Sequence, residues 1–342
     1  MRYRDAGVDI SAASRAKSGI KELVSETFNA RVLRGFGAFG GFFSLERLPK
    51  DAVLVSSMDG VGTKLKIAFA ANRHGSVAAD LVYHSANDIA VHGATPLFFL
   101  DYLATGKIRP KVVTEIVGGL ARACREVGCA LVGGETAQMP GFYAPNEYDL
   151  AGCIVGWVRR RQILDGKRIR PGDVILGLPS LGLHTNGYSL ARKVLLEQAG
   201  LRLSQRVPEL GRPLGDVLLA PHRCYQPVVQ PLTQKGWVTG LVHVTGGGIT
   251  DNTPRVLPPK CSAEIRLGSW PAPPIFSLIA GLGRVPQQEM LHTFNMGLGM
   301  LVIVPPRNLE KVTAALKRKR EKFWLVGCIT RGKPEVRYVQ SG

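Results

Sequence analysis

Long apolar runs are missing from this chain of 342 residues, and so are closely paired cysteines. Because no stretch of eighteen apolar residues occurs, the sequence predicts no membrane-spanning helix. The first residues are charged and form no apolar signal segment, so we expect a cytoplasmic protein. The six cysteines include no C-x-x-C pair and mostly stand among apolar residues, which favours buried, reduced thiols over a zinc site.

Acidic residues are also scarce, since 26 Asp and Glu face 44 Lys and Arg and leave a net charge of +18. An excess of this size can indicate nucleic-acid binding. However, the densest basic runs, at 159–161, 167–170 and 317–320, contain no interleaved aromatic residues. The sequence therefore predicts no dedicated nucleic-acid role, and a basic surface that attracts phosphorylated small molecules.

The remaining composition is that of a globular, loop-rich chain, with 45% hydrophobic residues, 40 glycines and 22 prolines. Its length suffices for two domains that each bury a core. A strand-like run at 155–158 is followed by a basic segment and the turn Arg170-Pro171-Gly172-Asp173. We therefore predict an α/β domain over residues 1–165 and a second over residues 171–342.

The most informative motif is Asp59–Lys64 (DGVGTK), directly after the apolar strand-like run 52–57. Its carboxylate can ligate Mg²⁺, and its glycines let backbone N–H groups approach phosphate oxygens. A glycine-rich turn after a strand is, by itself, as often only a turn. The residues of this motif that we expect to contact a nucleotide are Gly60, Gly62, Thr63 and Lys64.

Two more acids stand at or near the ends of predicted core elements. Asp88 lies in a predicted helix over 76–92, on a polar stripe of residues spaced by four that could also be a solvated face. Glu135 follows the buried-strand pattern 130–132. Oxygen ligands gathered at such an edge suit Mg²⁺, which completes its shell with water and phosphate. The sequence thus predicts a magnesium site formed by Asp59, Asp88 and Glu135, with Asp101 a weaker fourth candidate.

Nine segments along nearly the whole chain resemble, in order, the aminoimidazole ribonucleotide synthetases, or phosphoribosylformylglycinamidine cyclo-ligases, of purine biosynthesis. They are YRDAGVDI (3–10), the glycine loop 35–41, MDGVGTK (58–64), Asn87-Asp88, PLFFLDYLATG (96–106), VGGETAQMPG (132–141), HTNGYSL (184–190), HVTGGG (243–248) and FNMGLGM (294–300). The resemblance implies that ATP phosphorylates the formamide oxygen of formylglycinamidine ribonucleotide, after which the ring closes to 5-aminoimidazole ribonucleotide, ADP and phosphate. It also implies a homodimer whose N-terminal sheets form a central barrel, and a C-terminal sheet flanked by helices.

The same resemblance suggests roles for further residues. Lys21 would lie near the nucleotide, although the sequence alone indicates only a helix-surface lysine. His184 would transfer protons during ring closure. The loop 35–40 matches G-x-G-x-x-G, but a strand-like run (41–45) follows it, which argues against a dinucleotide site. The residues that we expect near the phosphorylated ribonucleotide substrate are Gly37, Gly40, Asn186, His243, Thr245, Gly246 and Gly247. His74, His222 and His292 have no motif support.

Other interpretations share the implied fold or abandon catalysis. A sister kinase such as thiamine-monophosphate kinase is disfavoured by the HTNGYSL and FNMGLGM segments. Selenophosphate synthetase would require a reactive residue near the N-terminus, and no cysteine precedes Cys124. An RNA-associated protein without turnover stays open, although a binding module has no need of a metal cluster.

Overall fold

The structure is a computed structural model that describes residues 10–340, so most of the YRDAGVDI segment lies outside the described residues. The chain divides into two compact units. The N-terminal unit extends to Ile89 and includes Thr95–Arg160, while the C-terminal unit comprises Ala90–Ala94 and the chain from Arg161 onward. The division at Arg160 lies five residues before the predicted end of the first domain.

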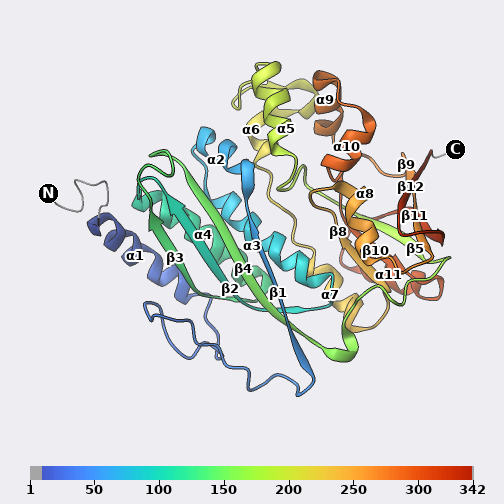
Figure 1. Ribbon diagram of the computed structural model, residues 1–342, viewed down its shortest axis with the longest axis horizontal. Helices are drawn as coiled ribbons and strands as arrows, with labels where there is room; N and C mark the ends of the chain where they lie inside the picture. The colour runs from blue at the N-terminus through green and yellow to red at the C-terminus, as the bar shows by residue number, and fades with distance from the viewer. Residues whose placement is uncertain (1–9, 341–342) are drawn as a thin grey trace. The chain divides into compact units, whose positions relative to one another are not determined.

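The N-terminal unit is a four-stranded sheet in the order β1-β4-β2-β3, with β1 and β4 antiparallel and β2 and β3 parallel (Figure 1). Its strands are β1 (Ala52–Gly60), β2 (Thr95–Thr105), β3 (Ala130–Gln138) and β4 (Tyr148–Arg159). Its helices are α1 (Ile10–Ser25), α2 (Leu65–Ala71), α3 (Gly75–Ala90) and α4 (Pro110–Val127), with a 3-10 turn at Gly62–Lys64. The predicted strand-like run 41–45 contributes only one bridge, between Val32 and Phe43.

One face of this sheet is covered by helices. Side chains alternate between the two faces of a strand, so Ser57 and Asp59 of β1 share the helix-covered face. Gly156 of β4 lies on that face too, and a Cβ there would stand 2.6 Å from Ile89 of α3. The glycine therefore lets α3 pack directly on the sheet.

The opposite face, which we call the open face, is apolar and exposed. The strand register places Met58 of β1 beside Cys153 of β4, and Cys153 in turn pairs with Leu100 of β2. Leu54 of β1 lies beside Trp157 of β4. Met58 is 72% exposed and Leu54 54%. Exposed apolar side chains on adjacent strands are unusual for a sheet face that only meets water, and are typical of interaction surfaces.

The C-terminal unit is built on a six-stranded sheet in the order β12-β9-β11-β5-β10-β8. The sheet strands are β5 (Val174–Pro179), β8 (Gly240–His243), β9 (Cys261–Leu267), β10 (Leu298–Val304), β11 (Trp324–Arg331) and β12 (Val336–Gln340), beside the small pair β6 (Arg206–Val207) and β7 (Arg212–Pro213). The helices are α5 (Tyr188–Arg192), α6 (Leu214–Leu218), α7 (Gln226–Gln234), α8 (Gly248–Asn252), α9 (Pro274–Gly283), α10 (Gln287–Thr293) and α11 (Leu309–Arg318).

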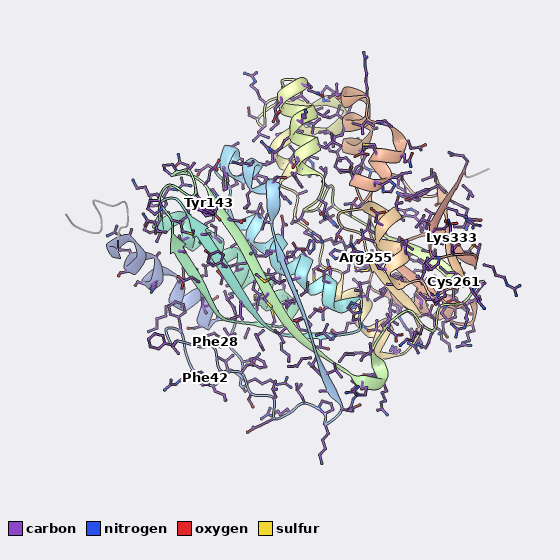
Figure 2. All side chains as sticks on the ribbon, in the orientation of Figure 1. Phe28, Phe42, Tyr143, Arg255, Cys261 and Lys333 are labelled. Atoms are coloured by element: carbon purple, nitrogen blue, oxygen red, sulfur yellow. The ribbon has the colours of Figure 1, made fainter. Side chains whose placement is uncertain are left out.

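The central strand β10 is buried along its whole length, as its uninterrupted apolar sequence predicts. Met300 and Val302 join one apolar cluster with residues of α7 and α11, whereas Leu301 and Ile303 join another that contains Trp270. Apolar layers thus cover both faces, which confirms the expected C-terminal sheet flanked by helices. Figure 2 shows the side chains on this framework.

Candidate functional site

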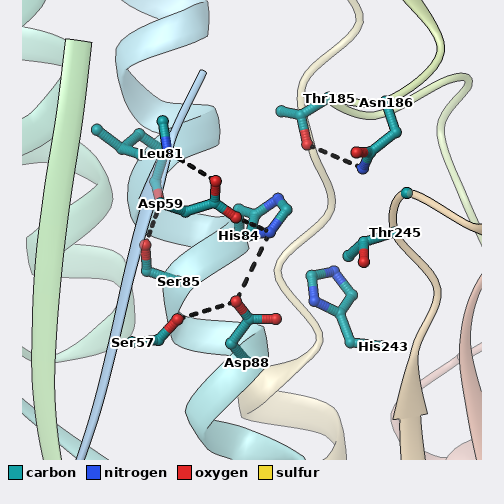
Figure 3. Close-up of polar contacts among 12 residues, drawn as sticks. Ser57, Asp59, Leu81, His84, Ser85, Asp88, Thr185, Asn186, His243 and Thr245 are labelled. Atoms are coloured by element: carbon teal, nitrogen blue, oxygen red, sulfur yellow. Dashed lines mark hydrogen bonds and ion pairs between the residues drawn. The ribbon is translucent and has the colours of Figure 1, made fainter. Parts of the chain in front are cut away.

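Four polar residues of the N-terminal unit form what we call the acid–histidine cluster: Ser57 and Asp59 of β1, and His84 and Asp88 of α3 (Figure 3). His84 Nε2 lies 2.6 Å from Asp59 Oδ2 and 3.6 Å from Asp88 Oδ2. The Ser57 hydroxyl donates to Asp88 at 3.0 Å, and the Gly60 N–H donates to Asp59 at 2.7 Å. The two carboxylates therefore meet at one nitrogen.

Local geometry explains why these residues meet. Positions 57 and 59 share a face because a strand alternates with period two, and positions 84 and 88 share a helix face because they are one turn apart. The strand extends to Gly60, beyond the predicted run, so Asp59 projects from the sheet rather than from the following turn. The polar stripe of α3 is therefore not exposed to solvent at His84, because this side chain is buried against β1.

The electrostatics of the cluster favour the charged forms of Asp59 and His84. Burial acts to raise the pKa of Asp59, but the hydrogen bond and charge of His84 and the Gly60 N–H bring it below its usual value. Burial likewise acts to lower the pKa of His84, yet its hydrogen bond to Asp59 and the charges of Asp88, Asp59 and Asp80 raise it. Both shifts therefore stabilise the ion pair between Asp59 and His84.

This donor set fits Mg²⁺. The ion takes one or two protein carboxylates and completes its octahedron with water and phosphate oxygens. Asp59 and Asp88 both lie close to His84 Nε2, so their oxygens are near enough to one another to share a divalent cation. Gly60, Gly62 and Thr63, which follow Asp59 directly, are exposed and can face a phosphate.

Lys64 lies elsewhere than the sequence predicts. Its side chain is 0% exposed, and its ammonium stands 2.6 Å from the equally buried Asp80 carboxylate. The expected contact between Lys64 and a phosphate is therefore not supported, because the charge is neutralised inside the unit. The structure indicates instead that the Lys64–Asp80 pair anchors the turn Gly62–Lys64 on α3.

Glu135 does not join the two other predicted ligands in one chain. Asp59 aligns across the sheet with Gly152, Asp101 and Gly134, whereas Glu135 aligns with Tyr102 on the open face. Strands β1 and β3 are opposite edges, so three strand spacings, about 14 Å, separate them. Of the three predicted ligands, the structure therefore brings only Asp59 and Asp88 together within a chain. Asp101 lies on the helix-covered face, where burial raises its pKa to about 7.

The other residues predicted in this unit also lie toward β3. Lys21 is exposed on α1, a helix that contacts α4 and β3. Gly37 and Gly40 are exposed in the loop before β1, and a Cβ on the adjoining Gly41 would stand 2.9 Å from the Val132 carbonyl of β3. The predicted N-terminal site residues are therefore divided between the two edges of the sheet.

In the C-terminal unit three histidines form what we call the histidine stack. The rings of His184 and His222 are stacked with centroids 4.1 Å apart. His222 Nε2 lies 3.0 Å from His243 Nε2, and His222 Nδ1 lies 3.4 Å from the Thr185 hydroxyl. All three histidines are buried. Predicted residues His184 and His243 are thus linked through His222.

His222 is a functional candidate that the sequence analysis missed. It stands in the irregular segment between α6 and α7, outside all the matched motifs. No periodicity or spacing in one sequence connects it with residues 184 and 243. In contrast, the structure explains why the FNMGLGM motif has a glycine at position 299. A Cβ there would lie 2.5 Å from His184 and 2.1 Å from the Tyr225 hydroxyl.

The predicted substrate residues of this unit also come together. After β8, the turn Thr245–Gly247 leads into α8, and Gly247 adopts a left-handed φ of +93° where a Cβ would collide with Asp251. Asn252 Nδ2 donates to the Gly246 carbonyl at 3.0 Å. A Cβ on Gly246 would lie 3.2 Å from Asn186 Oδ1, so Asn186 lies against this turn. Figure 3 shows Asn186, Thr245 and His243 of this unit.

No helix within residues 10–340 combines the length and apolar character that crossing a membrane requires.

Comparisons with known proteins cover nearly the whole chain. Residues 32–158 match the family described as AIR synthase related protein, N-terminal domain, and residues 170–340 match its C-terminal domain. The chain is 48% identical over 326 residues to a phosphoribosylformylglycinamidine cyclo-ligase of Trichlorobacter lovleyi, covering 95% of this chain and 93% of that relative. It is 50% identical over 331 residues to the cyclo-ligase of Magnetococcus marinus, with coverages of 96% and 93%.

Solved structures share the fold at lower identity. Thiamine-monophosphate kinase from Stenotrophomonas maltophilia superposes with a TM-score of 0.68 at 17% identity, covering 93% of this chain and 94% of that one. The hydrogenase maturation protein HypE of E. coli gives 0.68 at 20% identity, with coverages of 95% and 93%. T. maritima PurL complexed with AMPPCP gives 0.56 at 16% identity, covering 95% of this chain and 48% of that one.

Proposed function

This chain belongs to the family of phosphoribosylformylglycinamidine cyclo-ligases, and from that premise we propose how its own residues carry out the family's reaction in the cytoplasm. The substrate is formylglycinamidine ribonucleotide. Its formamide oxygen receives the γ-phosphoryl group of ATP, and the amidine nitrogen then attacks the activated carbon. The oxygen departs with phosphate as the imidazole ring closes. Positioning and charge neutralisation are the main tasks of a protein in phosphoryl transfer.

The acid–histidine cluster carries this proposal. Asp59 and Asp88 would hold Mg²⁺, which supplies positive charge to the polyphosphate of ATP. The exposed Gly60, Gly62 and Thr63 would donate hydrogen bonds to phosphate oxygens, since glycines let a ligand approach the backbone closely. His84 would hold both carboxylates in place until the cation enters. The single supporting observation is the convergence of two carboxylates on His84 Nε2.

The C-terminal residues would serve the ribonucleotide substrate. The turn Thr245–Gly247 with Asn186 offers backbone and amide groups for the ribose phosphate. We assign proton transfer during ring closure to the histidine stack as a unit, because His184 and His243 are both in contact with His222.

Two observations support the homodimer expected from the family. The open face presents Leu54 and Met58, which a second copy of the sheet would bury. In addition, Glu135, Lys21 and the loop 35–41 lie toward one edge of the sheet while Asp59 and Asp88 lie toward the other. A partner sheet supplying the second group would complete a site that one chain leaves divided.

The direct test is ADP release from Mg²⁺-ATP with and without formylglycinamidine ribonucleotide, with the product identified by mass. We expect ADP only when this substrate is present, together with a product lighter by one water. Phosphorylation of thiamine monophosphate, or no ATP turnover with salt-dependent RNA binding, would instead support the sister-kinase or RNA-associated interpretation.

A further inference from the structure

A pocket of about 940 Å³ opens in the C-terminal unit at the end of the sheet where β5 begins. Three loops line it: residues 169–171 before β5, residues 258–261 before β9, and residues 331–334 after β11. Cys261 and Lys333, labelled in Figure 2, belong to two of these loops. The six residues of β5, about 20 Å of extended chain, separate this end from the end that leads to the histidine stack. The pocket is thus distinct from the proposed active site.

The charge of this basic pocket is of one sign. Its lining includes four cationic residues, Arg170, Lys260, Arg331 and Lys333, and among the described residues that line it none is Asp or Glu. The nearest acid along the chain, Glu335, is already shared between Lys333 at 3.1 Å and Arg337 at 2.9 Å. Cations gathered in a hollow raise the local concentration of anions. Arg170, from the basic run 167–170 that the proposed reaction leaves unexplained, lines this pocket.

Backbone contacts fix the shape of the pocket. The Arg170 guanidinium donates to the carbonyls of Lys167 and Ile169 at 2.6 and 2.8 Å, which holds that cation against its own loop. The Gly332 N–H donates to the Lys260 carbonyl at 3.2 Å, joining the other two loops. Lys260 itself has a left-handed φ of +74°, an uncommon conformation for lysine. Four prolines stiffen the rim: Pro171, Pro258, Pro259 and Pro334.

These features select the chemistry of a ligand. The volume is in the range of small-molecule sites, roughly 300–1,000 Å³. The described lining has no aromatic side chain on which bases could stack, so sequence-tolerant binding of single-stranded nucleic acid lacks its usual platform. We propose that the basic pocket is a second, non-catalytic site that binds a small phosphorylated molecule, for which inorganic pyrophosphate serves as the probe.

Calorimetric titration of the full chain with inorganic pyrophosphate tests the proposal. The variant Lys260→Ala/Arg331→Ala removes two pocket cations, and Lys317→Ala/Arg318→Ala removes two exposed cations at the end of α11 as a matched control. We expect the pocket variant to bind pyrophosphate at least tenfold more weakly at that site and the control to change less than twofold. Equal weakening in both variants, or none in the pocket variant, would overturn the proposal. Arg331→Gln, a single exposed change, repeats the test if the double variant has a lower melting temperature.

Two further arms separate this site from its alternatives. Anisotropy of a labelled 20-nucleotide RNA should decrease in parallel for both double variants; selective loss of RNA binding in the pocket variant, with pyrophosphate binding unchanged, would overturn the small-molecule assignment. Turnover of formylglycinamidine ribonucleotide should stay within twofold in both variants, and its loss in the pocket variant alone would contradict a non-catalytic site. If the unmodified chain showed no turnover, the pyrophosphate titration would still report on the pocket.

Discussion

The two units organise their polar residues in opposite ways. In the N-terminal unit, charges of opposite sign pair at short range, as in Lys64–Asp80 and His84–Asp59, and the predicted site residues are divided between two sheet edges. In the C-terminal unit, the predicted residues His184 and His243 meet through His222, by ring stacking and a contact between ring nitrogens. Asn186 lies against the turn at Gly246 of the same chain. The acid–histidine cluster of the N-terminal unit therefore depends on charge balance, whereas the histidine stack of the C-terminal unit depends on packing.

The largest loss of turnover is expected for Asp59→Asn, which changes one carboxylate of the acid–histidine cluster. The amide keeps the shape but loses the negative charge that binds a cation and pairs with His84. We expect ADP release with formylglycinamidine ribonucleotide to fall about 10³-fold or more while the circular dichroism spectrum is unchanged. The control is Asp51→Asn, which removes the partly exposed ion pair between Asp51 and Arg159 at the beginning of β1. Turnover at the unmodified rate in Asp59→Asn would show that the metal assignment is wrong.

Lys64→Met tests whether charge balance also sustains the fold of the N-terminal unit. It leaves the Asp80 carboxylate buried without its cation, so we expect the free energy of unfolding in urea to fall by about 3–5 kcal/mol. Lys66→Met, two residues away, removes an exposed pair with Glu147 and should cost less than about 1 kcal/mol. Equal effects of the two substitutions would contradict the anchoring role, and Lys64→Met/Asp80→Leu should recover most of the loss.

Met58→Lys tests the proposal that the predicted site residues of the N-terminal unit need a partner chain to form a complete site. A lysine at this exposed position of the open face would place an unpaired charge in the proposed dimer interface. We expect the dimer dissociation constant to rise about 100-fold by sedimentation, and turnover to fall with the dimer fraction. Leu282→Lys, on an exposed part of α9 in the other unit, should change neither. Full activity in a monomer would contradict the proposal that residues of two chains form the site.

His222→Ala tests the proposed role of the histidine stack. Without the central imidazole, His184 loses its stacking partner and His243 its hydrogen bond. We expect kcat to fall about 10–100-fold with KM changed less than twofold, and His222→Gln, whose amide can reach the position of Nε2, to recover part of kcat. The exposed His292→Asn serves as a control. A rise in KM at unchanged kcat would identify His222 as a binding residue instead.

Asp101→Asn should have the smallest effect and the clearest pH dependence. Burial raises the pKa of Asp101 from an ordinary 3.8 to about 7, so the folded state holds a proton that the unfolded state releases above pH 4. Ionisable Asp101 therefore makes the fold less stable as pH rises from about 4 to 7. The Asn variant removes this penalty and should gain about 1–2 kcal/mol at pH 8, less than the full shift implies because the residue is half-buried. Melting curves at pH 4 and pH 8 measure the gain, which should be absent at pH 4 and in exposed Asp149→Asn.

Much of the local structure could be predicted from sequence. The four-residue spacing in the predicted helix placed Asp88 on one face with the other polar residues of its stripe, because a helix has a fixed backbone period. Asp59, in contrast, was expected in a turn after the strand, and the structure extends β1 to include it. The polar stripe of α3 was less certain, because the same spacing also suits a solvated face. Only the packing of α3 on β1 decided that His84 is buried.

The failures have a common cause. Glu135 follows a buried-strand pattern like that of Asp59, but strand order placed it at the opposite edge and its register placed it on the opposite face. Lys64 has the residue type of a phosphate ligand, but a partner sixteen positions away neutralises it. Pairing between segments far apart in sequence determines both outcomes, and periodicity carries no information about it.

The family could be identified from the sequence because nine motifs resemble it in order along the chain. The two α/β halves and the glycine turns could also be predicted, because backbone periods and glycine conformations are local properties of the chain. Only the tertiary structure shows that Asp59 and Asp88 meet at His84, that Lys64 is internal, and that His222 joins His184 and His243. These are matters of which surfaces meet, and burial and electrostatics act on a side chain only through the neighbours that the completed fold provides.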